Sequence, residues 1–232
     1  MTVKAWLDGH QFDLEDLVYL LPTGDVRVIK EGDRYYLSAP ELDNPPQGKQ
    51  FYEVAPDALN RVNAIGRLNR PEFQPVKLAM QFETDHGHHH HVVVKGAAIS
   101  RSKAYGVLVS ANGQVQIPPP PGPDQVRVAH THPDAAQALE ILGTSSALGW
   151  VELYKVFEIV RDAVKPTKLN DAGLADTRDI TAFTASANRP DVSGADARHA
   201  RMSGGPPKLR MTLPEGRQFI SALVTAWIDS LR

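Results

Sequence analysis

The sequence predicts an α+β protein, with a β-rich domain over residues 1–130 and an all-helical domain over residues 131–232. Short runs rich in β-branched and aromatic residues dominate the first half, which is typical of strands. After Pro133 the apolar residues recur at steps of three and four, which is typical of helices. Between the two patterns lies PPPPGP, residues 118–123, a stretch that we interpret as a stiff surface connection.

The first half contains several expected strands and a hairpin. The run VKAWL leads into a turn at Asp8-Gly9, and FDLEDLVYLL has the pattern of a short helix capped at Asp13. The run DVRVIKEGDRYYLSA reads as two strands joined at residues 31–33. We expect PVKLAMQF, the histidine-rich run after it and QVRVAH beyond the proline run to be extended as well.

Residues 55–70, APDALNRVNAIGRLNR, form the one strong helical pattern of the first half. The polar residues of this helix share a face opposite Leu59, Val62 and Ile65: they are Asn60, Asn63, Arg67 and Arg70. Such a face could hold phosphate. The favoured interpretation is a solvated face, because charged residues usually lie on the outside of an amphipathic helix.

The pattern of apolar residues in the second half of the sequence predicts a helical bundle. Trp150, Leu153, Phe157 and Val160 lie on one stripe of a helix, so we expect them to be buried against the last helix. A shorter helix begins near Thr177 and stops at Pro190. The last helix has the spacing of a capping box, with Thr212 followed three residues later by Glu215. Its apolar face is Phe219, Leu223, Trp227 and Leu231.

Composition limits the functional classes. The formal charge is −2, and acidic and basic residues nearly balance in each half, so nothing in the overall charge indicates a polyanion or membrane partner. The chain has no cysteine, which excludes disulfides, iron–sulfur clusters and thiolate zinc sites. No apolar run is long enough to span a bilayer. We therefore expect a cytoplasmic protein with no membrane partner.

The stretch TDHGHHHHVVVKG, residues 84–96, holds five of the nine histidines. If it is extended, side chains alternate, so His88 and His90 share one face while His89 and His91 share the other. The favoured interpretation is a polar strand start or hairpin tip. The alternative is a transition-metal site that recruits a second pair of histidines. His130 and His132 are spaced for one face of a strand, and imidazoles bind zinc, nickel or copper well. No other cofactor is indicated.

A locally basic segment runs from Ala197 to Pro214 without an acidic residue. Arg198 and His199 are the candidate catalytic pair, because a guanidinium can hold a phosphate while an imidazole exchanges protons near neutral pH. Arg201, Lys208 and Arg210 are the candidate phosphate or RNA ligands. The alternative is a solvated basic loop, or one whose arginines bind the carbonyls at helix C-termini.

The order of WVELYKVFEIVRDAV, DITAFTASAN, ARHA and PEGRQFISALVTAWI resembles a recurrent uncharacterised bacterial family. Its layout is similar to the all-helical HEPN domains of toxins and phage-defence proteins. That resemblance implies a metal-independent ribonuclease that works as a homodimer, with an arginine and a histidine four to six residues apart. Here Arg198 and His199 are adjacent and Arg189 lies ten positions before His199, so neither spacing matches. An inactive HEPN-like binding module is equally compatible with the pattern.

Three functional hypotheses follow. The first is an RNA-binding or RNA-processing protein, of the defence or toxin type, whose helical part is HEPN-like. The second is a non-catalytic ligand- or protein-binding protein whose helical half makes an oligomer. The third is a protein with a metal site built on the histidines at positions 88, 90, 130 and 132.

Overall fold

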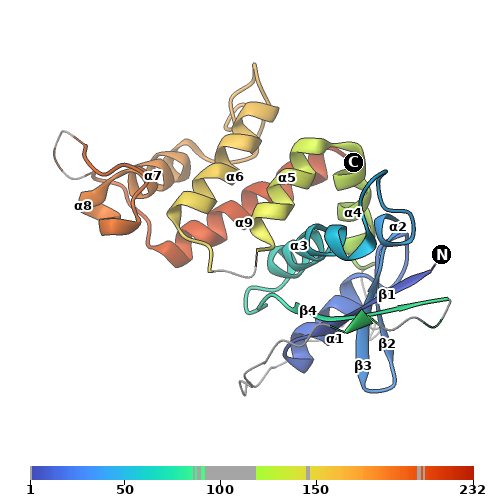
Figure 1. Cartoon of the computed structure of the whole chain (residues 1–232). Coiled ribbons are helices and arrows are strands. Elements are labelled where there is room, and N and C mark those ends of the chain that lie inside the picture. Colours follow the sequence, from blue (N-terminus) through green and yellow to red (C-terminus); the bar gives the residue numbers. More distant parts are fainter. Residues whose placement is uncertain are drawn as a thin grey trace, which may run out of the picture. The chain divides into compact units, whose positions relative to one another are not determined.

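The computed structural model describes residues 2–85, 87, 90–91, 119–144, 147–202, 205 and 207–232, with only the backbone of Met80, His90 and His91. It confirms the α+β class: an antiparallel sheet forms in the N-terminal part and most of the later residues are helical (Figure 1). The chain divides into two compact units. The sheet unit comprises residues 1–59 and 76–123, and the helical unit comprises residues 60–75 and 124–232.

The sheet has the strand order β2-β3-β1-β4-β5, and each neighbouring pair is antiparallel. Its strands are β1 (Val3–Asp8), β2 (Arg27–Glu31), β3 (Arg34–Ser38), β4 (Lys77–Thr84) and β5 (His90–His91). The expected β2–β3 hairpin is confirmed, with Glu31 paired to Arg34 and a positive φ of 61° at Gly32. A two-residue hairpin turn favours glycine at such a position, because other residues are strained there.

Helix α1 (Gln11–Leu20) buries Leu14, Leu17 and Leu20 in the sheet unit. The expected cap at Asp13 is wrong. Instead, His10 is the N-cap, and its Nδ1 accepts a hydrogen bond of 3.2 Å from the backbone N–H of Phe12. A short helix α2 (Pro40–Asp43) follows β3.

The division between the units falls inside helix α3 (Phe51–Asn69), between Leu59 and Asn60. On the C-terminal side it falls between Pro123 and Asp124 rather than at the expected residue 130. The run QVRVAH, expected to be a strand, belongs to helix α4 (Gly122–Thr131). Gln125, Val128 and Ala129 are buried, and their spacing of three and four residues is that of one helix face.

The helical unit packs around one aromatic core. Its other helices are α5 (Pro133–Leu142), α6 (Trp150–Ala163), α7 (Thr177–Asn188), α8 (Pro190–Ser193) and α9 (Leu213–Ser230), with a 3₁₀ turn η1 at Gly194–Asp196. Figure 1 shows α9 running alongside α6. The fully buried ring of Phe183 contacts four other aromatic rings: Trp150, Tyr154, Phe157 and Phe219.

The expected burial of the α6 stripe is confirmed, since Trp150, Leu153, Phe157 and Val160 are all at most 4% exposed. Leu223 and Trp227 of α9 are buried in the same core. In the part of the chain that the structure describes, no helix combines the length and apolar character needed to cross a membrane.

Candidate functional site

The basic segment, residues 197–210, connects η1 to the start of α9, and hydrogen bonds hold both of its ends against α7. At one end, the backbone N–H of Arg198 donates to the carbonyl oxygen of Ala187 over 2.8 Å. Beyond the other end, the backbone N–H of Met211 donates to Oγ of the buried Ser186 over 2.7 Å. The segment therefore leaves and returns to the same point, the C-terminal end of α7.

The side chain of Arg198 is already engaged within the helical unit. Its guanidinium carbon lies 4.4 Å from the centroid of the Tyr154 ring, and its Nη2 lies 3.4 Å from Oε1 of Glu158. Both partners belong to α6, some forty residues earlier in the sequence. Arg198 thus anchors the start of the basic segment to the bundle.

The remaining candidate residues of the segment face solvent. The four exposed side chains are His199, Arg201, Lys208 and Arg210. Within the described residues none of them takes part in an ion pair or a side-chain hydrogen bond. The structure therefore brings Arg198 to Tyr154 and Glu158, but it joins none of the other four to a neighbour. They present three cations and an imidazole that are free to bind an external ligand.

The histidines proposed as metal ligands do not form a site within the described residues. His88 lies outside these residues, and His90 is described only as a backbone partner of Phe82. The expectation that His130 and His132 share a strand face is wrong, because His130 lies in the last turn of helix α4 and His132 is the N-cap of α5. Among the described side chains, no three His, Asp or Glu groups lie close enough to hold a metal ion.

Two arginines near the α5–α6 connection were not expected to be neighbours. Arg67 of α3 donates to the carbonyl oxygen of Leu142 over 2.5 Å, and Arg217 of α9 donates twice to that of Leu148, over 2.9 and 2.7 Å. Burial, together with the smaller effect of the positive charge of Arg217, lowers the pKa of Arg67 to about 10. The face of α3 that we interpreted as solvated is therefore partly internal, and Asn63 on it is only 1% exposed.

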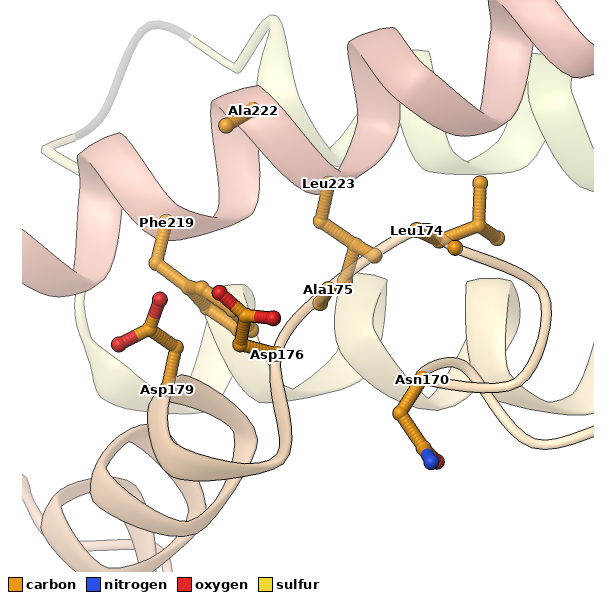
Figure 2. A pocket seen from close by; sticks show the side chains of 9 residues that line it. Asn170, Leu174, Ala175, Asp176, Asp179, Phe219, Ala222 and Leu223 are labelled. Carbon is orange, nitrogen blue, oxygen red and sulfur yellow. The ribbon is translucent and has the colours of Figure 1, made fainter.

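A surface groove lies between α9 and the start of α7, with a volume of about 310 Å³ (Figure 2). We call it the α7–α9 groove. Its lining residues are Asn170, Gly173, Leu174, Ala175, Asp176, Asp179, Phe219, Ala222 and Leu223. The carboxylates of Asp176 and Asp179 lie beside the Phe219 side chain in Figure 2. Both aspartates are exposed, and neither carboxylate has an ion-pair or hydrogen-bond partner among the described residues.

The chain matches no family model, no curated protein and no solved structure. The HEPN-like interpretation of the helical unit is therefore still a hypothesis. Any functional proposal for this chain depends on the chemistry of its own residues. Two surfaces of the helical unit offer such chemistry, namely the exposed cations of the basic segment and the α7–α9 groove.

Proposed function

We propose that the helical unit binds single-stranded RNA through phosphate contacts made by Arg201, Lys208 and Arg210. The observation that carries this proposal is that the three cations are exposed and have no carboxylate partner among the described residues. No acidic residue lies between Ala197 and Pro214 to compete for them. Cations that neutralise phosphates release condensed counterions, and this release is the main source of sequence-independent affinity for nucleic acid.

Arg198 has a positioning role in this proposal. Its stacking on Tyr154 and its ion pair with Glu158 fix the start of the segment, so that less conformational entropy is lost when RNA binds. His199 follows directly, and its exposed imidazole is the type of side chain most often used as a general acid or base. If the bound RNA is cleaved, His199 is the group that assists attack by the 2′-hydroxyl, in keeping with the HEPN resemblance.

The binding test compares two triple variants in fluorescence anisotropy with a short labelled single-stranded RNA. R201A/K208A/R210A removes the proposed contacts. K155A/K168A/R178A removes the same charge from other exposed cations of the helical unit and is the matched control. We expect the first variant to weaken binding about tenfold or more and to reduce the slope of log affinity against log salt by about 2, which is three contacts at about 0.7 each.

The results of the binding and cleavage assays distinguish RNA binding by the basic segment from binding spread over the surface and from no binding. Equal effects of the two triple variants would show that binding is spread over the whole surface, and the assignment to the basic segment would be wrong. No binding by the unaltered protein in low salt would end the proposal. Cleavage is scored separately on gels in the presence of EDTA, with H199A and with DNA of the same sequence. RNA products that persist in H199A would remove the catalytic role of His199.

A further inference from the structure

The α7–α9 groove offers an apolar floor with negative charge at its edge. Leu174 and Ala222 supply accessible aliphatic surface above the buried Leu223, while Asp176 and Asp179 supply two carboxylates. Asp176 is the N-cap of α7 and Asp179 lies in its first turn, where the helix dipole favours negative charge. An occupant that complements this groove carries a cation next to an apolar side chain.

The chain itself presents such a pair. Within the described residues, the exposed large hydrophobic side chains are Tyr19, Tyr52, Val151 and Met202. Met202, which is 47% exposed, is the one of these that lies in the basic segment, directly after the exposed Arg201. Methionine adapts its shape to irregular apolar surfaces, and arginine is enriched at the centres of protein interfaces.

The described residues of the chain's own basic segment do not fill the groove. No described residue of that segment lines the groove. The segment is anchored at Ser186 and Ala187, near the C-terminal end of α7, whereas Asp176 and Asp179 lie at its N-terminal end. At 1.5 Å per residue, Asp179 and Ser186 are about 10 Å apart along the helix axis, and Asp176 and Ala187 are about 16 Å apart.

We propose that Arg201 and Met202 of one copy of the chain dock in the α7–α9 groove of a second copy. Met202 contacts the floor at Leu174 and Ala222, and Arg201 pairs with the two aspartates. The contact is heterologous, because a segment of one copy binds a different surface of the other. The groove is far smaller than a standard interface, so the association is weak and reversible.

This proposal does not depend on RNA binding, although both use Arg201. If both hold, RNA competes with self-association for the same side chain. Neutralising the groove would then leave RNA affinity unchanged or raise it, whereas removing Arg201 would weaken both activities. The two proposals can therefore fail independently.

The test is sedimentation velocity of the whole chain over a range of concentrations, with circular dichroism to confirm that each variant folds. We expect D176N/D179N and M202A each to lower the association constant by about tenfold. Asparagine is itself a good N-cap, so D176N should leave α7 intact. The matched controls are D134N, at the first turn of α5, and V151A, an exposed apolar position of α6; both should associate like the unaltered protein.

Charge exchange identifies the partners. R201E and D179K alone should each associate about tenfold more weakly than the unaltered protein, because like charges then face each other. Their equimolar mixture should recover association to within about threefold, because the unaltered Arg201 of the D179K copy meets the unaltered groove of the R201E copy, and the two substituted positions also carry opposite charges. A chain that stays monomeric at the highest concentration would overturn the proposal. So would association that is indifferent to both groove and segment variants, or a mixture that shows no recovery.

Discussion

The guanidinium of Arg198 stacks on the ring of Tyr154, with 4.4 Å between the guanidinium carbon and the ring centroid. The Tyr154 ring is itself buried and contacts Phe157 and Phe183. The first residues of the basic segment are thus attached to the aromatic core of the helical unit through a single arginine.

Replacing Arg198 should loosen this attachment at a modest cost in stability. We expect R198A to lower the free energy of unfolding by about 1 kcal/mol, because it removes one cation–π contact and one largely exposed ion pair. The measurement is denaturant unfolding, with R178A as the exposed-arginine control. A loss no larger than that of R178A would show that Arg198 does not anchor the segment.

Phe157 tests the packing of the helical core. Its side chain is 2% exposed and contacts the rings of Tyr154 and Phe183. We expect F157A to lower the free energy of unfolding by about 3–5 kcal/mol, as truncations of buried aromatic residues do. V151A on the exposed side of the same helix should cost less than about 0.5 kcal/mol. A loss below about 1 kcal/mol for F157A in reversible unfolding would contradict the assigned face.

Gly143 tests a close approach of two backbone segments. A Cβ at this position would lie 1.5 Å from the carbonyl oxygen of Asn60, so a side chain there forces α3 and the end of α5 apart. We expect G143A to unfold the helical unit or to cost more than about 3 kcal/mol, as a severe core clash does. G205A is the control, because nothing lies within 4 Å of the Cβ it would carry. Equal stability of the two variants, compared by thermal unfolding, would show that the contact is absent.

The hydrogen bonds of Glu215 at the start of α9 should make the stability of the protein depend on pH. Hydrogen bonds from the backbone N–H and hydroxyl of Thr212 lower the pKa of Glu215 below its ordinary value near 4.5. The ionised form is favoured in the folded state, so its contribution is present above the unfolded pKa and is lost as pH falls through the folded pKa. The stability difference between the parent and E215Q should therefore shrink as the solution is acidified below about pH 4.5.

Chemical denaturation at a series of pH values measures this difference. A difference between parent and E215Q that stays constant from neutral pH to pH 3, or grows on acidification, would contradict the assigned hydrogen bonds.

The sequence predicts the long helices and the β2–β3 hairpin well because their signals are local. The apolar stripe of α6 and the capping box of α9 are each defined by residues only three or four positions apart, and the structure confirms both. The prediction of a strand for QVRVAH is wrong because an alternation of apolar and polar residues over so short a run is also compatible with a helix. Its helical state follows from burial of Gln125, Val128 and Ala129 on one face, which is a tertiary effect.

The candidate site was only partly predictable. The basic character of residues 197–210 is visible in the sequence, because the number of charged residues in a segment does not depend on how the chain folds. The engagement of Arg198 is not, since Glu158 lies forty residues earlier and no period links them. The α7–α9 groove combines residues from a loop, the start of α7 and the middle of α9, and only packing brings these together.

Helix α3 contributes residues to both units, which affects how fragments of the chain can be chosen and when the helical unit can fold. Its residues from Asn60 onward belong to the helical unit, where Arg61 pairs with Glu140 over 2.8 Å and Ala64 is fully buried in the core. A fragment that starts at residue 124 or 131 lacks this piece and leaves the surface of α5 around Gly143 uncovered. During synthesis, this piece of α3 emerges well before α9. Because α9 supplies part of the helical core, that core cannot close until α9 has left the ribosome.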